Sequence, residues 1–318
     1  MKGGNCMDYP AISDVLRIQR THAPHGKISM VLDTDTYNEI DDQFALIYSL
    51  LSPSKLDVKS IYAAPFVNSR SSSPVEGMER SYQEILTLLA KLGDKCTSPP
   101  VFKGSDRWMH SDQFAVKSDA ASQLVELAMN QADGDLLYVV AIAAITNIAS
   151  AIQMEPAILN RIVVVWLGGH PHNHHHTDEF NLKQDPVASS IILDSGVPLV
   201  MMPCANVAEH LLLTREDVIN RIDYSNPVGE YLAKEFLKYA DETFSDSRPI
   251  WDMTPIAWLI QSEWVQTSLI HAPAIAIRQN ASQQCVWAVD TTRHFIREAY
   301  RVNRDAIFKD FFTKLNVM

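Results

Sequence analysis

The fold is decided by the stretch Met30-Val31-Leu32-Asp33-Thr34-Asp35-Thr36-Tyr37-Asn38-Glu39-Ile40-Asp41-Asp42-Gln43-Phe44-Ala45-Leu46. The run just before and into it, residues 28–32, is apolar except for Ser29 and predicts a buried strand. After a polar loop, apolar residues recur at helical spacing, at Phe44, Ile47, Tyr48 and Leu51. The stretch therefore predicts a strand, a turn and a helix that begins near Asp41, which is how an α/β unit starts.

This turn is unusually acidic, because it contains Asp33, Asp35, Glu39, Asp41 and Asp42. Carboxylates that lie close together repel one another unless a cation is bound among them, and their hard oxygens suit Ca²⁺ or Mg²⁺. The alternative is that the last two acids only cap the helix while the others are solvated loop residues. Capping explains one or two of the five carboxylates, so the pattern favours a metal site.

Strands and helices alternate along the rest of the chain. Apolar runs predict strands at residues 57–64, 136–144, 162–167 and 199–202, and shorter strands at 274–277 and 285–289. Helical patterns occur at residues 79–92, 120–131, 146–152, from 185 onward, over most of 214–259, and at 308–315. The alternation predicts an α/β fold with a mostly parallel central sheet and helices on both faces, in a single domain over residues 1–318.

The unusual polar clusters all follow predicted strands. They are residues 33–42, Asn68, Thr146-Asn147 and residues 168–181. In open parallel sheets, ligands bind beyond the carboxyl ends of the strands. We therefore expect these clusters to meet at one edge of the sheet and to form the functional site.

Composition restricts the possible partners. The chain has 318 residues, of which 47% are hydrophobic and 20% charged, and its formal net charge is −11. This charge offers no electrostatic footprint for nucleic acid or an anionic membrane surface, and no apolar run is long enough to span a bilayer. The first ten residues lack the apolar core of a secretory signal, so we expect a cytoplasmic protein. The four cysteines, Cys6, Cys96, Cys204 and Cys285, form no CxxC pair and predict reduced thiols.

The ordered set of motifs resembles the nucleoside hydrolase family, the inosine-uridine-preferring N-ribohydrolases. The DxDxxxDD turn of that family corresponds to Asp33-Thr34-Asp35 followed by Asp41-Asp42. The further matches, in the order of the family, are Asn68, Ile145-Thr146-Asn147-Ile148-Ala149, Leu167-Gly168-Gly169, Glu179-Phe180-Asn181, Asp185-Pro186 and Asp252. The resemblance covers about residues 28–259. It implies a Rossmann-like α/β architecture and hydrolysis of the N-glycosidic bond of ribonucleosides to ribose and a free base.

The resemblance also implies roles for individual residues. A Ca²⁺ ion would be held by Asp35, Asp42, the backbone carbonyl of Thr146 and Asp252, and Asp35 would take a proton from water at the ion. The ribose-binding positions correspond to Asp41, Asn173, Glu179 and Asn181, and Asn68 corresponds to a position that supports the site. For these residues, ordinary loop capping is the alternative. The implied partner is a small nucleoside substrate, and the family suggests a homodimer or homotetramer.

Two features depart from the family pattern. The segment between Asp35 and Asp41 is two residues longer than the family motif, so this loop is expected to bulge. The residue before Asp252 is often a histidine that helps the base to leave, but here it is Trp251. An indole cannot act as an acid at neutral pH, although it can stack on a base. We therefore expect Trp251 to contact the substrate or to pack at the rim of the site.

A histidine-rich loop, His170-Pro171-His172-Asn173-His174-His175-His176, contains five of the eleven histidines. Three interpretations are open, and we rank them in this order: a solvent-exposed loop, a source of the acid for the leaving base, and a zinc site. Adjacent histidines in a loop seldom converge on one metal ion without further ligands at set spacing.

Two other functions compete with nucleoside hydrolysis. An aspartyl-phosphate phosphatase also carries a DxD motif after a strand, and here Asp33 would be its nucleophile and Asp35 its acid. That class does not require Asp41-Asp42 or the residues 179–181. The second competitor is a non-catalytic nucleoside- or sugar-binding protein on the same fold, which Trp251 makes plausible.

Overall fold

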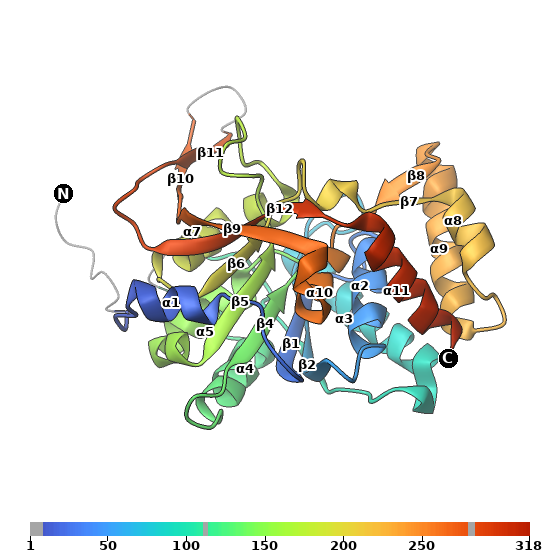
Figure 1. Ribbon diagram of the computed structural model, residues 1–318, viewed down its shortest axis with the longest axis horizontal. Coiled ribbons are helices and arrows are strands. Elements are labelled where there is room, and N and C mark those ends of the chain that lie inside the picture. Colours follow the sequence, from blue (N-terminus) through green and yellow to red (C-terminus); the bar gives the residue numbers. More distant parts are fainter. Residues whose placement is uncertain (1–8, 111–113, 279–283) are drawn as a thin grey trace.

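An eight-stranded sheet runs through the middle of the molecule (Figure 1). The computed structural model describes residues 9–110, 114–278 and 284–318. The strand order is β3-β2-β1-β4-β5-β6-β12-β9. In chain order these strands are β1 (Ile28–Thr34), β2 (Leu56–Ala63), β3 (Val101–Lys103), β4 (Leu137–Ala141), β5 (Ile162–Leu167), β6 (Leu199–Met202), β9 (Val265–His271) and β12 (Phe295–Val302). Neighbouring strands are parallel except for β12 and β9, so the predicted mostly parallel sheet is confirmed.

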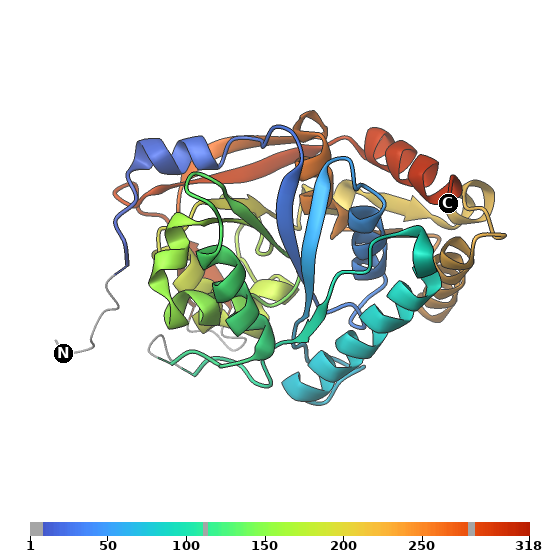
Figure 2. The same cartoon turned by 90° about the horizontal axis from the view of Figure 1, so that it is seen from below.

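Helices cover both faces of the sheet (Figure 2), as predicted. Successive residues of β1 face opposite sides, so Leu32 packs in one apolar cluster and Val31 in the other. The cluster that contains Leu32 is covered by α2 (Asp41–Leu50), α3 (Pro74–Leu92), α9 (Pro227–Thr243), α10 (Met253–Ile260) and α11 (Arg304–Asn316). The other is covered by α4 (Asp119–Met129), α5 (Thr146–Met154) and α7 (Pro186–Asp194). Burial on both faces explains why the central strands are nearly continuous apolar runs.

Local sequence signals set the ends of two helices. Ser73 caps α3 by accepting a hydrogen bond from the backbone N–H of Glu76, and Pro74 is the first helical residue. The helix therefore begins five residues before the predicted start at residue 79. Asp185 caps α7 in the same way, by accepting from the N–H of Ala188, and the predicted start at Asp185-Pro186 is confirmed.

The last third of the chain differs most from the prediction. Strands β9 and β12 were not predicted, and they complete one side of the central sheet. The predicted strands β10 (Ala274–Ile277) and β11 (Cys285–Ala288) are present, but they form a separate antiparallel pair. The region predicted as mainly helical contains α8 (Arg215–Arg221), α9 and α10. A short antiparallel pair, β7 (Leu212–Thr214) and β8 (Ser247–Pro249), brackets α8 and α9.

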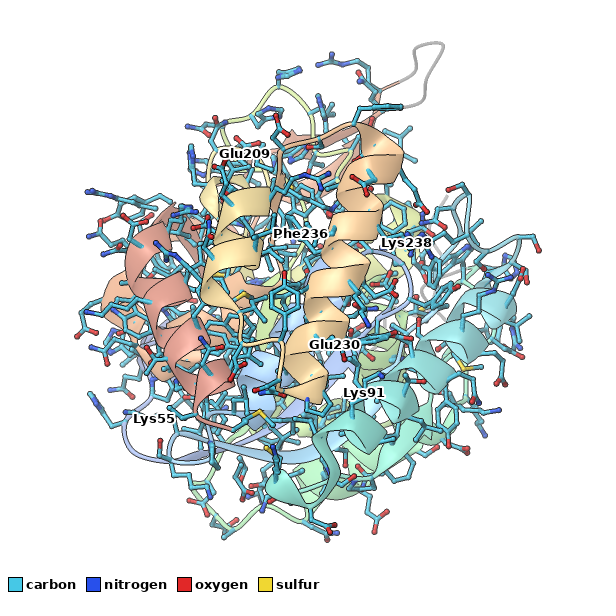
Figure 3. The ribbon with its side chains drawn as sticks, turned by 90° about the vertical axis from the view of Figure 1, so that its right-hand side faces the viewer. Lys55, Lys91, Glu209, Glu230, Phe236 and Lys238 are labelled. Atoms are coloured by element: carbon cyan, nitrogen blue, oxygen red, sulfur yellow. The ribbon has the colours of Figure 1, made fainter. Side chains whose placement is uncertain are left out.

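Helices α9 and α3 lie side by side at one end of the molecule (Figure 3). Phe236 of α9 is 1% exposed and packs into the apolar cluster beneath. At the other side of α9, the ammonium group of Lys91 lies 4.4 Å from the ring centroid of Tyr231.

Cys96, Cys204 and Cys285 are free thiols, and Cys6 lies outside the described residues. None of the helices in the described part of the chain has the length and apolar character needed to cross a membrane.

The order in which strands are added to the sheet reverses at β1, which pairs with β2 on one side and with β4 on the other. The connections that follow β1 and β4 therefore leave the sheet in different directions. A crevice opens between such connections at the carboxyl ends of the two strands, and this is where ligands bind in open α/β sheets.

Candidate active site

A cavity of about 230 Å³ lies at the carboxyl ends of the central strands. Its walls come from the β1–α2 loop, the start of α2, the residues after β4 and β5, and the residues before α10. The lining residues are Asp35, Asn38, Glu39, Asp41, Asp42, Ile142, Leu167, His170, Asp178, Glu179, Phe180, Asn181, Cys204, Trp251 and Asp252. Distant parts of the sequence thus meet at the edge that the polar clusters predicted.

One wall of the cavity is acidic. Asp41 and Asp42 form the first turn of α2, where the positive end of the helix favours carboxylates, and Asp252 is the N-cap residue of α10. One carboxylate oxygen from each of these three residues lies within 4.8 Å of the other two. Asp35 lines the same cavity and is 1% exposed, and neither of its carboxylate oxygens has a hydrogen-bond partner among the described residues.

The acidic wall carries more negative charge than the surrounding protein compensates. Burial, followed by the charges of neighbouring carboxylates, raises the pKa of Asp35, Asp42 and Asp252 well above its ordinary value. Burial and the charge of Glu39 raise the pKa of Asp41 to about 7. Asp42 accepts a hydrogen bond of 2.5 Å from the Thr34 hydroxyl, but one oxygen of Asp252 has no partner among the described residues. Buried carboxylate oxygens of this kind fit a divalent cation that prefers hard oxygen ligands.

The five acids of the β1–α2 turn lie in different surroundings. Strand β1 extends to Thr34, so Asp33 lies in the strand and not in the loop as predicted. Its carboxylate accepts a hydrogen bond of 2.7 Å from the Asn147 amide, and burial raises its pKa to about 7. Glu39 forms an ion pair with Arg248. Of the five, Asp35, Asp41 and Asp42 line the cavity, and none of these three forms an ion pair with a cationic side chain of the described residues.

The opposite wall contains Glu179 and Asn181 at the start of α6 (Phe180–Gln184). The Glu179 carboxylate accepts three backbone N–H bonds, from Gly169, Asn181 and Leu182, at 2.8 to 3.0 Å. Gly169 adopts a φ of +71°, which favours glycine, and a side chain there would collide with Met201. A carboxylate offers about four acceptor positions, so Glu179 both caps the helix and keeps one position for a ligand.

The amide of Asn181 is held by the end of strand β5. Its Nδ2 donates a 3.0 Å hydrogen bond to the backbone carbonyl of Leu167, so the side-chain oxygen is left to face a ligand. Asn181 is buried and lines the cavity. The structure thus brings Glu179 and Asn181 to the same wall, as the sequence analysis expected.

Three predicted site residues, all within the described part of the chain, are not among the lining residues. Asn68 donates a 2.6 Å hydrogen bond to Asn38, which does line the cavity, so Asn68 supports the wall from behind. Thr146 is the first residue of α5, and its hydroxyl donates to Asp185 at 2.8 Å. Asn173 is exposed in the histidine-rich loop. Just after the end of β4 the wall is formed by Ile142, four residues before Thr146.

Several lining residues were not predicted. Ile142 contributes an apolar side chain, which carries no chemical signal in the sequence. Asn38 lies in the segment that is two residues longer than the family motif, so the extra length was its only sequence signal. Asp178 lies just before α6 and Cys204 lies just after β6, and only the folded chain brings these two positions to the cavity.

Aromatic and histidine side chains form the remaining part of the wall. Trp251 is half-buried, and the Arg248 guanidinium lies 5.3 Å from its ring centroid. The indole N–H of Trp251 has no hydrogen-bond partner among the described residues. Among the described lining residues, His170 alone comes from the histidine-rich loop, and burial followed by the nearby His174 and His176 lowers its pKa to about 4. His170 is therefore neutral at pH 7.

The fold defines an α/β protein with a cavity at the carboxyl ends of its parallel strands, and the buried carboxylates there could bind a metal ion. Comparisons with known proteins give the family. The family model described as inosine-uridine preferring nucleoside hydrolase matches residues 30–309. The chain belongs to this nucleoside hydrolase family, which confirms the resemblance drawn from the sequence motifs.

Individual relatives agree with this assignment. The pyrimidine-specific ribonucleoside hydrolase RihB of Escherichia coli O157:H7 is 32% identical over 184 residues, which span 55% of this chain and 55% of that relative. The chain thus matches about half the length of the curated relatives. Among solved structures, a purine-preferring ribonucleoside hydrolase from Gardnerella vaginalis has a TM-score of 0.69 at 20% identity, over 91% of this chain and 98% of that one. An inosine-guanosine nucleoside hydrolase has a TM-score of 0.71 at 16% identity, over 91% and 99%. These structures share the fold.

Proposed function

We propose that this protein hydrolyses the N-glycosidic bond of ribonucleosides to ribose and a free base, with a bound Ca²⁺ ion. The observation that carries the proposal is the convergence of Asp35, Asp41, Asp42 and Asp252 at one cavity, buried and without enough cationic partners. Membership of the nucleoside hydrolase family supports the reaction, and the hard oxygen donors support the choice of ion.

The cation would be held by Asp35, Asp42 and Asp252, with Asp41 beside them. The resemblance implied a fourth ligand from the backbone carbonyl of Thr146. Because Ile142 and not Thr146 borders the cavity, we assign this carbonyl ligand to Ile142. When bound, such an ion would supply positive charge that offsets part of the charge of the carboxylates, and it would lower the pKa of a nearby water molecule.

Asp35 is the proposed general base. Its two carboxylate oxygens have no hydrogen-bond partner among the described residues, so either can accept a proton from water. As the water oxygen bonds to the anomeric carbon, the proton passes to Asp35. The N-glycosidic bond breaks, and its electron pair leaves with the base. The sugar gains positive charge in the transition state, which the negative wall of the cavity stabilises.

The ribose hydroxyls would be bound by Asp41, Glu179 and Asn181. Glu179 has one acceptor position left after its three backbone hydrogen bonds, and Asn181 has a free amide oxygen. Asn38, supported by Asn68, lies at the same cavity and can contribute a further polar contact. The predicted contact of Asn173 with ribose would require movement of its exposed loop toward the cavity.

The leaving base would lie near Trp251 and His170. The Trp251 ring can stack on a planar base. His170 has a pKa of about 4, so at pH 7 it is a hydrogen-bond partner and not an acid that protonates the base. These contacts support binding of the base more directly than its protonation.

The phosphatase alternative is disfavoured by the position of Asp33. Its carboxylate is fully buried, is bound to Asn147 and does not line the cavity, so it is not placed to attack a phosphoryl group. Release of phosphate from a phosphorylated sugar would support that alternative instead. The nucleoside-binding alternative predicts tight binding without turnover.

Release of reducing sugar from a panel of purine and pyrimidine nucleosides tests the proposal, with the native protein and the Asp35→Asn variant. Loss of the general base is expected to lower kcat by about 10²- to 10⁴-fold while the circular dichroism spectrum is unchanged. Asp246→Asn, at an exposed acid away from the cavity, is the matched control and should retain the native rate. If Asp35→Asn turns over at the native rate, Asp35 is not the base.

We also make proposals about the domain organisation, the cellular location and the oligomeric state of the protein. We infer a single domain over residues 1–318, supported by one sheet that extends from β1 near the start to β12 near the end. We further propose a cytoplasmic homodimer or homotetramer. Light scattering of the purified protein would give its oligomeric state.

A further inference from the structure

Three histidines of the loop after β5 form a compact group. One ring nitrogen from each of His170, His174 and His176 lies within 4.8 Å of the other two. The three ring centroids form a nearly equilateral triangle, with sides of 4.7 Å, 4.8 Å and 5.1 Å. This convergence was the least favoured of the three interpretations of the histidine-rich loop.

The triangle has the dimensions of a three-histidine metal site. A zinc ion binds an imidazole nitrogen at about 2.0–2.1 Å, which places each ring centroid about 3.2 Å from the ion. Two such rings at a tetrahedral angle have centroids about 5 Å apart, which agrees with the observed distances. The ring planes are inclined at 57°, 71° and 82°, so the rings do not stack face to face. Their edges, which carry the nitrogens, can therefore point to a common centre.

Hydrogen bonds fix the loop before any ion is bound. The Nδ1 atom of His174 lies 2.9 Å from the backbone carbonyl of His176 and donates to it, which leaves the Nε2 lone pair of His174 free. The Nδ1 atoms of His170 and His176 accept only long backbone contacts, of 3.4 Å and 3.2 Å. The contact to His170 exceeds the normal hydrogen-bond range and the contact to His176 lies at its upper limit, so both compete only weakly with a metal ion for these nitrogens.

The ends of the loop are tied to the rest of the fold. His172 hydrogen-bonds through Nδ1 to the buried Glu298 of β12 at 2.7 Å. The backbone N–H of Thr177 donates to the Cys285 carbonyl at 2.8 Å. A ligand set that is already positioned loses little conformational freedom when it binds an ion.

The group differs chemically from the acidic wall. Imidazole nitrogens suit Zn²⁺ and similar transition metals, whereas the carboxylates suit Ca²⁺. The group has three protein ligands among the described residues, and this number leaves one position of a tetrahedral ion open, as in catalytic zinc sites. Because His170 also lines the cavity, an ion held here would lie at its rim.

We propose that His170, His174 and His176 bind a transition-metal ion of the zinc class at the rim of the cavity. This second metal site is separate from the Ca²⁺ site and does not depend on the proposed reaction. Its open position is available to water or to a donor atom of a molecule in the cavity.

Co²⁺ titration tests the proposal, because four-coordinate Co²⁺ absorbs visible light far more strongly than six-coordinate Co²⁺ bound by oxygens. The protein is prepared without a polyhistidine tag, and excess Ca²⁺ keeps the carboxylates occupied. The native protein is expected to show the intense band, complete at one equivalent of Co²⁺, and to lose it when Zn²⁺ is added. His174→Ala and His176→Ala are each expected to lose the band.

His175→Ala is the matched control, because His175 lies in the same run but outside the three-histidine group. It is expected to keep the band and its one-to-one stoichiometry. Circular dichroism establishes that each variant is folded, and having two ligand variants protects the test if one of them misfolds. The proposal is overturned if the native protein shows no intense band, or if His175→Ala loses it as completely as His174→Ala does.

Discussion

The acidic wall and the histidine-rich loop gather their side chains in opposite ways. Asp41 and Asp42 begin one helix, Asp252 precedes another, and all three are at most 4% exposed. His170, His174 and His176 come from one short loop and are only partly buried. The acidic wall therefore depends on the packing of α2 against α10, whereas the histidine group depends on local hydrogen bonds. Substitutions in the acidic wall should therefore affect the stability of the whole protein, whereas substitutions in the loop should affect mainly the loop's own conformation.

The largest effect is expected when the most distant member of the acidic wall is removed. Asp252→Ala should weaken Ca²⁺ binding by more than about 100-fold, because substitution of a residue that only supports a metal ligand already lowers the affinity by about 10- to 100-fold. Nucleoside turnover should fall with it. Calorimetric titration with Ca²⁺ measures the affinity, and Asp246→Ala, an exposed acid of the same region, should bind as the native protein does. Unchanged affinity in Asp252→Ala would remove Asp252 from the site.

The acidic wall should also make stability depend on pH. The pKa of Asp41 is about 7 in the folded protein, against an ordinary value of 3.8, so the folded state binds more protons. In the presence of EDTA, this contribution to stability is full below pH 4 and is lost as pH rises through 7. Added Ca²⁺ should restore stability at pH 8. At a concentration 100 times its Kd, it should raise the free energy of unfolding by about 2.7 kcal/mol, which corresponds to a few °C in Tm.

Thermal unfolding at pH 5 and pH 8, with EDTA or with Ca²⁺, measures this dependence. The Asp42→Asn variant should lose most of the Ca²⁺ effect at pH 8. A native protein whose Tm in EDTA rises from pH 5 to pH 8 would contradict the picture of uncompensated buried carboxylates.

A smaller effect is expected at Trp251, which lines the cavity and lies beside Arg248, the ion-pair partner of Glu39. Trp251→Ala removes a stacking surface worth about 0.5–1.5 kcal/mol, so KM for a nucleoside should rise by up to about tenfold. Trp251→Phe keeps an aromatic ring and should recover most of the loss. A fall in kcat with unchanged KM would instead indicate that Trp251 acts on the reaction step.

The smallest effect is expected where the loop is tied to the sheet. His172→Ala removes the ring contact with Glu298 but leaves the backbone N–H of residue 172, which donates to the same carboxylate at 3.0 Å. The free energy of unfolding should fall by about 1 kcal/mol or less. Urea unfolding measures it, with His175→Ala as control. A much larger loss would show that the loop stabilises the whole fold and not only its own conformation.

The central sheet was predictable because its strands are covered on both faces. Strands β4 and β5 are continuous apolar runs, and such runs are visible without knowledge of their neighbours. Strand β12 was missed because it carries Arg297, Glu298 and Arg301 and is partly exposed, so its apolar pattern is diluted. Its partner β9 is also poorly buried, because only Val265 of its seven residues is buried. Their pairing also depends on backbone hydrogen bonds, which no side-chain pattern reports.

The site was predictable where a motif coincides with the end of an element. Asp41-Asp42 and Glu179-Phe180-Asn181 start helices, and the chain order of these motifs already indicated one shared edge. Thr146 and Asn173 were assigned by resemblance alone, and the cavity wall is formed by other residues at those places. Whether a backbone carbonyl borders a cavity depends on the path of the chain, and side-chain identity carries no information about it.

The sequence by itself determined the fold class, the family and the supply of carboxylates in the β1–α2 turn. Only the tertiary structure decided how those carboxylates are divided. Asp33 shares the face of β1 that carries Val31, so it meets Asn147 of α5 on that side of the sheet. Asp35 comes after the strand has ended, where the alternation of faces no longer applies, and it turns into the cavity. The packing of α10 against α2 then brings Asp252 to Asp41 and Asp42, because contacts between distant segments are set by the burial of whole helices and not by local sequence.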